Sequence, residues 1–288
     1  DERQADQLGV LYSTKVGYDA HKMADFFKTL YKMEMAESQG GVPTFLSTHP
    51  DPGDRYNTVY KYATKMQDSI KHEGQWLVNR DSYLNLVNGI IYGADPRQGY
   101  VEGNTFYQPT MKLKFTFPSG WQVENQPSQV NIGPSDGNAI ITFAMSSQKT
   151  PADAQKAMAE NLSLQTQQSK SLTVNGFQAI EALAKQASQN STTGAVDTNL
   201  VLSYYIDFNN TCLVFLGVSS KDNYKKFADQ FRSTMQSLHK RTDPSKINVK
   251  PQKLFVKKVT KTGTLSDVFA SLGVKKEDMA SLALLNEM

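Results

Sequence analysis

Residues 111–125, MKLKFTFPSGWQVEN, mark the point at which the pattern of the chain changes from helical to extended. Polar and apolar residues alternate over its first half, which is typical of a half-buried strand, and Pro118 to Gly120 predict a turn. Downstream, three further segments have strand character: 138–145, 171–186 and 198–220. The last of them predicts a hairpin that turns at Asn209 and Asn210.

Two helices are predicted among these strands, one opened by Thr150 and Pro151 and one carrying Tyr224, Phe227, Phe231 and Met235 at helical spacing. Strands joined by tight turns, with helices placed between groups of them, are typical of an α+β domain with an antiparallel sheet. We therefore predict such a domain over residues 109–240.

Upstream of this domain the periodicity is helical. A first helix is predicted from Glu2 to Val16, a second after Asp19, and a third from Asp51 and Pro52 to Gly74. Residues 1–74 therefore form a helical domain, and the turn-rich residues 75–108, with one helix over 80–93, form a connector. Residues 241–288 are a polar linker and a tail that predicts one strand and two short helices.

Composition sets the broad class. The 288 residues are 39% hydrophobic and 20% charged, which indicates a globular, multidomain α+β protein. A net charge of +3 gives no support for a nucleic-acid partner. No apolar run is long enough to span a bilayer. Because the chain begins without Met and inside a predicted helix, we expect a truncated or processed protein.

Two features have an ordinary structural interpretation. Cys212 is the sole cysteine and lies in an apolar stretch, so a buried and inert thiol is expected. The aromatic residues Trp121, Tyr204, Tyr205 and Phe208 could line a binding face, but core positions are the commoner role. The basic tail is expected to be a solvated face, with the lysines at positions 246, 250, 253, 257, 258 and 261.

The chemistry is expected at the amino terminus. Glu2 and Asp6 are four residues apart, so a helix places both carboxylates on one face. Such a pair can hold a metal ion through one carboxylate while the other accepts the ring N–H of a ligating histidine. A solvated pair of acids is the alternative, and the motif by itself does not decide between them.

The surrounding residues resemble a known family. The run ERQADQLGVLYSTKVGYDAHKMADFF, followed by FLSTHPDPGDR, is similar to the second half of the catalytic domain in peptidase family M forty-eight, the gluzincin-type zinc metallopeptidases that include HtpX-like, BepA-like and CAAX prenyl proteases. The resemblance implies that Glu2 is a zinc ligand and Asp6 its supporting carboxylate. The Thr-His-Pro segment and the following arginine of that family match Thr48, His49, Pro50 and Arg55.

His49 and Arg55 are therefore the candidate catalytic residues. Pro50 restrains the residue before it to an extended backbone, which would hold the His49 imidazole in one direction. We predict that His49 faces the metal, where it stabilises an oxyanion or fills an open coordination position. Arg55 could anchor a carboxylate near the site, and a surface arginine is the alternative.

The chain departs from the family in one decisive respect. Its histidines are His21, His49, His72 and His239, and no two of them are four apart. In KHEGQW, Trp76 stands where the second histidine of an H-E-x-x-H motif would have to be. The two remaining zinc ligands and the general base are thus expected upstream of Asp1, and the chain alone should be inactive.

The resemblance extends downstream. Longer bacterial members lead into a PsbP-like or Mog-like α+β domain and a LysM-like tail, which here looks partial. The implied protein is a zinc-dependent metalloendopeptidase of the bacterial periplasm or envelope, acting on misfolded polypeptides in quality control. The alternative is a non-catalytic scaffold that binds a partner protein or cell-wall glycan; a third possibility, a nucleic-acid binder, lacks a supporting motif.

Overall fold

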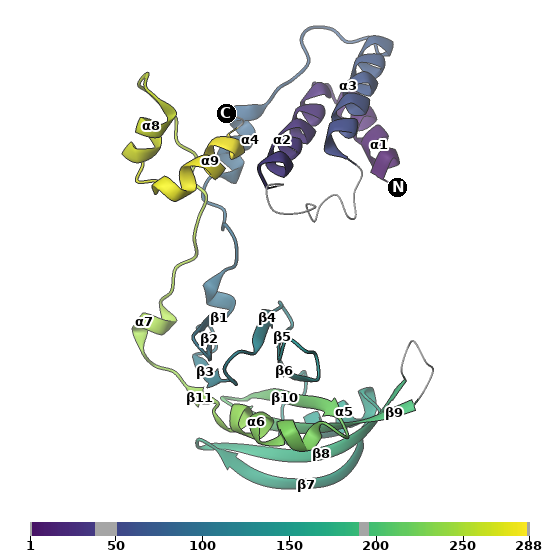
Figure 1. The fold of residues 1–288 in the computed structure, drawn as a ribbon, viewed down its shortest axis with the longest axis vertical. Coiled ribbons are helices and arrows are strands. Elements are labelled where there is room, and N and C mark those ends of the chain that lie inside the picture. The colour runs from purple at the N-terminus through teal and green to yellow at the C-terminus, as the bar shows by residue number, and fades with distance from the viewer. Residues whose placement is uncertain (1, 38–50, 190–195, 287–288) are drawn as a thin grey trace. The chain divides into compact units, whose positions relative to one another are not determined.

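The computed structural model describes residues 2–37, 51–189 and 196–286 of the chain. These residues divide into two units, each with its own hydrophobic core (Figure 1). Unit 1 combines residues 1–90 with the tail 254–288, and unit 2 comprises residues 91–253. The tail thus belongs to the same unit as the amino-terminal helices, although more than 160 residues separate them in the sequence.

Three helices form the centre of unit 1: α1 (Glu2–Lys15), α2 (His21–Glu37) and α3 (Pro52–Ser69). Both α1 and α2 pack against α3. Their buried apolar residues follow the helical period and meet in one cluster: Val10, Ala20, Ala24, Phe27, Val59 and Ala63. The three predicted amino-terminal helices are therefore present, and small residues in the cluster let the helix backbones approach closely.

The helix ends follow their sequence signals. Gly17 has a φ of 88°, a conformation that glycine adopts without strain, and it ends α1. Asp19 accepts the backbone N–H of His21 at the start of α2, with an N···O distance of 3.0 Å. Asp51 accepts the N–H groups of Gly53 and Asp54 at the start of α3, where Pro52 occupies the first turn.

The remaining helices of unit 1 are short. They are α4 (Arg80–Val87), α8 (Leu265–Ser271), the 3-10 helix η2 (Lys276–Asp278) and α9 (Met279–Leu285). The predicted helix over 80–93 ends at Val87, because Gly89 takes a φ of 88° and its N–H pairs with the carbonyl of Leu254. The two predicted tail helices are present, and the predicted tail strand is reduced to this short pairing.

Unit 2 is built on two antiparallel sheets, which confirms the predicted α+β class. Within the described residues their strand orders are β1-β2-β3-β11 and β4-β5-β6-β10-β9-β8-β7. The strands of the first sheet are β1 (Tyr100–Glu102), β2 (Thr105–Gln108), β3 (Leu113–Thr116) and β11 (His239–Lys240). Those of the second are β4 (Gln122–Asn125), β5 (Gln129–Gly133), β6 (Ala139–Met145), β7 (Gln165–Val174), β8 (Phe177–Gln189), β9 (Val196–Phe208) and β10 (Thr211–Ser220).

Two of these strands arise from residues interpreted as connector. β1 and β2 form a hairpin within 75–108, and β2 pairs with β3 in the register Phe106↔Phe115. Phe106 is fully buried there and belongs to the main core of unit 2. The hairpin was not predicted, because its strands are only three and four residues long and turn-forming residues surround them. Such short strands leave only a weak pattern in the sequence.

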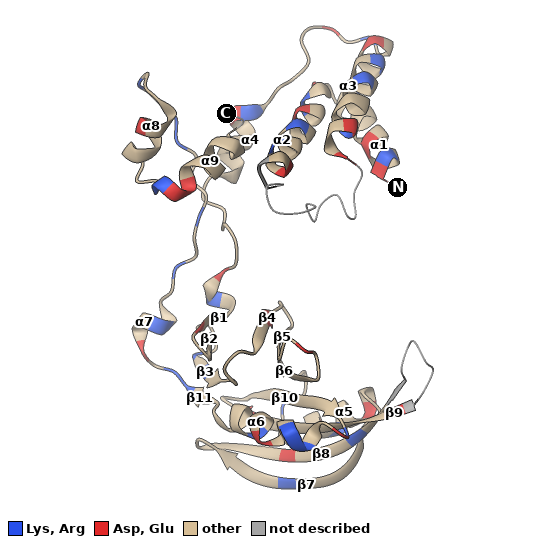
Figure 2. Cartoon of the chain, in the orientation of Figure 1, with Lys and Arg blue, Asp and Glu red and all other residues tan. Residues whose placement is uncertain are grey.

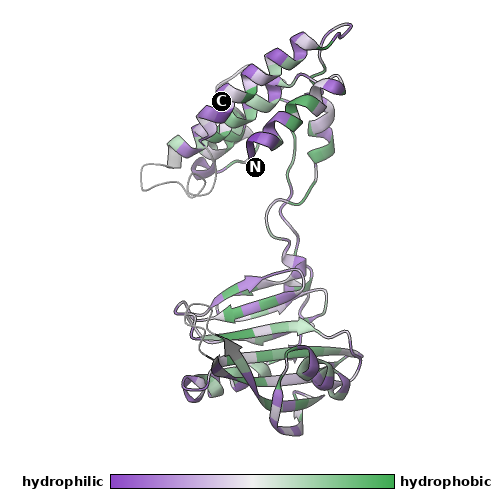
Figure 3. Cartoon of the chain, turned by 90° about the vertical axis from the view of Figure 1, so that its right-hand side faces the viewer, coloured by the Kyte–Doolittle hydropathy of each residue, from purple (hydrophilic) through white to green (hydrophobic). Residues whose placement is uncertain are grey.

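The helices α5 (Pro151–Asn161) and α6 (Tyr224–Gln236) cover opposite faces of the larger sheet. Successive side chains of a strand point to opposite faces, and this separates two neighbours in β9. Tyr204 packs in the cluster that contains Phe231 of α6, whereas Tyr205 packs in the cluster that contains Ala154 of α5. Few charged residues interrupt β8 to β10, and their central segments are hydrophobic (Figures 2 and 3).

The four aromatic residues considered for a binding face pack in the core of unit 2. Tyr204, Tyr205 and Phe208 are buried, and Trp121 packs edge-on against Phe227 and Phe231. The predicted β9–β10 hairpin is confirmed: Thr211 pairs with Phe208, and Asn209 and Asn210 between them take φ values of 52° and 63°.

Cys212 is buried on β10, as expected. Burial, and secondarily the charge of Asp207, raises the pKa of its thiol to about 11. The thiolate is therefore scarce at neutral pH, which agrees with an inert core cysteine. No helix among the described residues is both long and apolar enough to cross a bilayer.

Gly217 marks the closest approach of α6 to the sheet. A Cβ atom at this position would lie 2.5 Å from Cγ of the buried Phe231 ring. We expect Gly217→Ala to destabilise unit 2 by about 1–3 kcal/mol, the cost of overpacking a dense core. Chemical denaturation followed by Trp121 fluorescence in a Trp76→Phe background measures the effect in unit 2. Equal stability of wild type and Gly217→Ala would contradict the tight packing.

Candidate active site remnant

Glu2 and Asp6 lie in the first two turns of α1, and Arg55 lies in the first turn of α3. The structure brings these three residues together. The side chain of Asp6 is 8% exposed and that of Arg55 is 15% exposed, while Glu2 is 31% exposed at the edge of the group. The two carboxylates, which were predicted to share one helix face, therefore both contact the guanidinium of Arg55. Arg55 is 49 residues from Asp6 in the sequence.

Arg55 binds Asp6 through two parallel hydrogen bonds. Its Nη2 donates to Oδ1 at 2.7 Å, and its Nε donates to Oδ2 at 2.9 Å. The third donor, Nη1, reaches Oε2 of Glu2 at 2.9 Å. The planar guanidinium suits this arrangement, since a lysine could not engage both oxygens of Asp6 with fixed geometry. We call this group the Arg55 clamp; it comprises Glu2, Asp6 and Arg55.

The clamp is held in place by the start of α3 and by an aromatic ring. Asp51 caps the helix, and its carbonyl accepts the N–H of Arg55 at 3.1 Å. Phe27 of α2 lies under the guanidinium, with 4.2 Å between Cζ of Arg55 and the ring centroid. Cation and ring attract each other, and the attraction grows when water is excluded. Three helices therefore fix the direction of this one side chain.

The electrostatics favour the charged form of the Arg55 guanidinium. The hydrogen bonds to Asp6 raise the pKa of Arg55; burial opposes this shift, and the charges of Asp6 and Glu2 add to it. The guanidinium is thus charged at every pH at which the protein folds. One positive charge faces two carboxylates, so the clamp as a whole carries a net negative charge at neutral pH.

The residues present do not complete a metal site. Within the described part of the chain, no three histidine, cysteine, aspartate or glutamate side chains lie close enough to hold a metal ion. A zinc site requires at least three protein ligands, and Glu2 can supply one of them. The other predicted catalytic residue, His49, lies outside the described residues, so its role stays a prediction.

Two buried residues of α2 carry no signal of their environment in the sequence analysis. Phe27 follows the apolar period of its helix, and no local signal identifies it as the support of a guanidinium. Glu34 of α2 is 6% exposed, and neither of its carboxylate oxygens has a hydrogen-bond partner among the described residues. It extends the buried stripe of Ala20, Ala24 and Phe27, a spacing that could have drawn attention to it.

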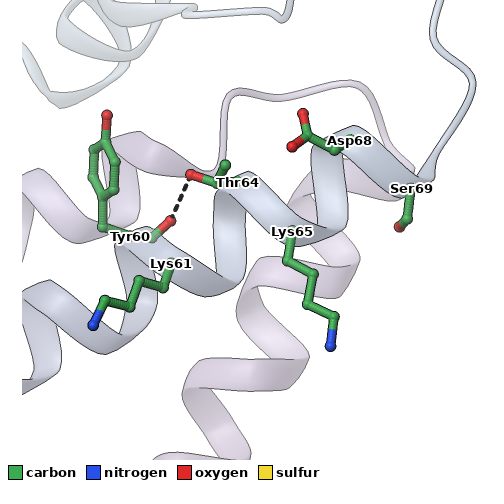
Figure 4. Close-up of a pocket in the computed structure, with 6 residues that line it drawn as sticks. All are labelled: Tyr60, Lys61, Thr64, Lys65, Asp68 and Ser69. Carbon is green, nitrogen blue, oxygen red and sulfur yellow. Dashed lines mark hydrogen bonds between the residues drawn. The ribbon is translucent and has the colours of Figure 1, made fainter.

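A second polar constellation in unit 1 links two helices. Nδ1 of His21 lies 2.8 Å from Oδ1 of Asp19, and Nε2 of His21 lies 2.9 Å from Oγ1 of Thr64. The order resembles a carboxylate, imidazole and hydroxyl relay beside a depression of about 650 Å³ on α3. Figure 4 shows, however, that the Thr64 hydroxyl bonds to the carbonyl of Tyr60. Its proton is engaged within the helix, so the chain of groups ties α2 to α3.

Comparisons with solved structures concern mainly unit 2. Cyanobacterial PsbP from Synechocystis matches at 13% identity with a TM-score of 0.38, covering 47% of this chain and 90% of the other. The Ran-binding protein Mog1p of Saccharomyces cerevisiae matches at 11% identity with a TM-score of 0.36, covering 51% and 99%. LpqN, involved in cell envelope biogenesis of Mycobacterium tuberculosis, matches at 14% identity with a TM-score of 0.29, covering 44% and 81%. Similarities of this size do not bear on function.

Comparison with curated proteins gave no match. A comparison with family models matched residues 1–63 to Peptidase_M48, peptidase family M48. The matched segment contains all three residues of the Arg55 clamp and the aromatic ring of Phe27. Over its amino-terminal helices, this chain is therefore similar to peptidase family M48.

Proposed function

We propose that this chain is the carboxy-terminal part of a zinc-dependent metalloendopeptidase in which Glu2 supplies one zinc ligand. The observation that carries the proposal is the Arg55 clamp, which holds two carboxylates in fixed directions within the segment similar to the peptidase family. A metal ligand has to be deprotonated and pre-oriented, and a charged guanidinium at 2.9 Å favours both conditions for Glu2.

Asp6 can still support a histidine. Each of its oxygens accepts one bond from Arg55, and a carboxylate oxygen has a second lone pair. In this proposal Asp6 accepts the ring N–H of a zinc-bound histidine from a segment outside this chain, and Arg55 positions Asp6. When bound, zinc lowers the pKa of a coordinated water and polarises a peptide carbonyl. In this proposal Glu2, Asp6 and Arg55 hold and orient, and the described residues do not complete the zinc ligand set by themselves.

Cellular context rests on the sequence resemblance. We propose a bacterial envelope location, polypeptide substrates and a role in protein quality control. The tail is proposed as part of a LysM-like unit that could contact cell-wall glycan. The order of its elements supports this proposal: α8 follows a Gly-Thr-Leu turn, Gly273 ends α8, and α9 follows.

Metal analysis of the full-length gene product tests the proposal. We expect about one zinc ion per chain, cleavage of an unfolded substrate such as β-casein, and loss of cleavage after chelation that added zinc restores. Glu2→Gln should lower the affinity for zinc by roughly ten- to a hundredfold or more, the scale of losses around metal ligands. Glu73→Gln, which changes an exposed carboxylate of unit 1, is the matched control.

Two results would decide against the peptidase. A full-length protein without stoichiometric zinc and without cleavage supports the alternative, a non-catalytic binding or scaffold protein. Glu2→Gln with unchanged zinc affinity would remove Glu2 from the ligand set.

A further inference from the structure

We infer that unit 2 carries a docking surface for an anionic lipid bilayer on the strand pair β3 and β11. These strands are antiparallel and have two residue pairs in register. The N–H of Arg241 donates to the carbonyl of Lys112 at 2.6 Å, which adds a third cross-strand position. Five of the six residues in these three positions are basic, and Leu113 is the sixth. We call the five residues the β11 basic face: Lys112, Lys114, His239, Lys240 and Arg241.

This concentration of positive charge opposes the stability of the fold. Opposite residues of an antiparallel pair have Cβ atoms about 5 Å apart, and like charges in such positions destabilise a sheet. Lys112 and Arg241 are two cations in this arrangement. Lys112 also has a φ of 55°, a conformation that is uncommon for a residue with a Cβ atom. Local features that conflict with the preference of the fold are typical of a functional surface.

Three of the charges on the β11 basic face are not neutralised by the chain. Arg241 pairs with Asp243, whereas the three lysines form no ion pair with any residue that the structure describes. Lys112 and Lys240 are exposed, and Lys114 is half-buried. Figure 2 shows further basic residues in blue along the chain from β11 to α7 (Pro244–Ile247). The face therefore presents a local positive charge to an external anion.

The aromatic residues beside the face do not suit a nucleic acid. Tyr100 and Tyr107 lie opposite each other on β1 and β2, and Tyr107 lies opposite Lys114 on β3. The two tyrosine rings stack on each other, with 5.2 Å between their centroids. Nζ of Lys246 lies 5.5 Å from the centroid of the Tyr107 ring. Because the rings are engaged within the unit, they offer no open platform on which a base could stack.

The remaining chemistry favours the head groups of a bilayer. All three uncompensated cations are lysines, which act as mobile point charges, whereas arginine is the residue that recognises single phosphates through two bonds. The edge strands β1 and β11 are three and two residues long, too short to bind an acidic peptide by strand addition. Lysines beside an anionic membrane each add about fivefold to its affinity.

Co-sedimentation with sucrose-loaded vesicles tests this inference on the chain itself. The vesicles contain phosphatidylcholine with about one third phosphatidylglycerol, and pure phosphatidylcholine vesicles are the uncharged reference. We expect binding to the anionic vesicles alone. Combined replacement of the three lysines should weaken it by roughly a hundredfold, by the fivefold effect of each. Salt raised from about 0.1 M to about 1 M should remove most of the binding, because it shortens the screening length from about 10 Å to about 3 Å. The variant is Lys112→Gln, Lys114→Gln and Lys240→Gln.

A second triple variant is the matched control. It replaces three exposed lysines of unit 2 that lie outside the β11 basic face: Lys149→Gln, Lys156→Gln and Lys185→Gln. Both variants remove three positive charges, so they differ only in the location of the change. The affinity of the control for anionic vesicles should stay within about threefold of wild type, because distant charges are screened. The basic-face variant should be at least as stable as wild type in urea, since it relieves repulsion between strands.

Several outcomes overturn the inference. These are no binding to anionic vesicles, equal binding to uncharged vesicles, or an equal loss of affinity in the two triple variants. Binding to duplex DNA or to poly-glutamate without binding to vesicles also overturns it, and would identify a nucleic acid or an acidic polypeptide as the occupant. The measurement involves neither zinc nor cleavage, so its failure is distinguishable from failure of the proposed function.

Discussion

Arg55→Ala is expected to destabilise unit 1 by about 3 kcal/mol, more than a hundredfold in the folding equilibrium. The substitution leaves the Asp6 carboxylate, which is 8% exposed, without the guanidinium that holds both of its oxygens. A buried charge that loses its partner keeps its desolvation cost and loses the compensating attraction. The loss of the cation over Phe27 adds to the effect.

Each unit contains one of the two tryptophans of the chain, so the effect can be assigned to unit 1. In a Trp121→Phe background the signal comes from Trp76, which stacks on His72 at 3.9 Å between ring centroids. Urea denaturation in this background reports on unit 1. In a Trp76→Phe background, Arg55→Ala should leave the midpoint of unit 2 unchanged.

Two companion variants separate the clamp from general packing. Arg55→Lys keeps a positive charge but loses the two-pronged geometry, and we expect it to recover less than half of the lost stability. Asp6→Leu combined with Arg55→Met should be less destabilising than Arg55→Ala alone, because the double replacement leaves no buried carboxylate at position 6 without its guanidinium. Equal losses for the single and double variants would show that the clamp contributes through shape alone.

Glu181→Ala is expected to destabilise unit 2 by about 3 kcal/mol, the upper range for hydrogen bonds to a charged group. Glu181 of β8 is buried beneath α6 and accepts a short hydrogen bond from the buried hydroxyl of Tyr204. Arg232 of α6 lies 3.4 Å from its carboxylate and Lys170 of β7 lies 3.3 Å away. Removing the carboxylate leaves these donors without their common acceptor.

The same carboxylate makes unit 2 sensitive to acid. Burial alone would raise the pKa of Glu181, but the hydrogen bonds from Tyr204 and Arg232 and the neighbouring positive charges outweigh it, and the pKa lies below its ordinary value of 4.5. The stabilisation is therefore complete above the pKa of the unfolded chain and is lost as the pH falls through the folded-state pKa.

Denaturation of the Trp76→Phe background at several pH values measures both effects. Wild type should lose stability more steeply than Glu181→Gln below about pH 4.5, where the carboxylate begins to protonate in the unfolded chain. Tyr204→Phe is the milder control and should cost about 1 kcal/mol. Parallel pH profiles of wild type and Glu181→Gln would show that this carboxylate does not govern acid stability.

Much of the local structure follows from the sequence. Helical spacing and capping residues predicted α1, α2 and α3, because caps such as Asp51 act on their own backbone. The Asn209 and Asn210 turn predicted the β9–β10 hairpin, because asparagine tolerates positive φ. Alternation predicted the strands around 111–145, and the burial of Cys212 and Tyr204 followed from apolar surroundings.

The sequence-based prediction of structure was less accurate where strands are short or where a segment packs against residues far away in the sequence. The hairpin of β1 and β2 went unnoticed within 75–108, because three- and four-residue strands gain their stability from β3 and the buried Phe106. The grouping of 254–288 with the amino-terminal helices could not be predicted, since no local pattern encodes a contact across such a separation.

In the candidate site, too, the local features follow from the sequence and the contacts between distant residues do not. By itself, the sequence determined that Glu2 and Asp6 share a helix face, that Arg55 lies at the start of the next but one helix, and that this chain has no H-E-x-x-H motif. These conclusions depend on helical spacing and on residue identity, which are local properties.

Only the tertiary structure decided that Arg55 binds both carboxylates over Phe27, and that residues 254–288 join the unit of the amino-terminal helices. Such contacts depend on how helices pack. Packing is selected by the summed burial of many side chains from distant segments, so it is not visible in any one stretch of sequence.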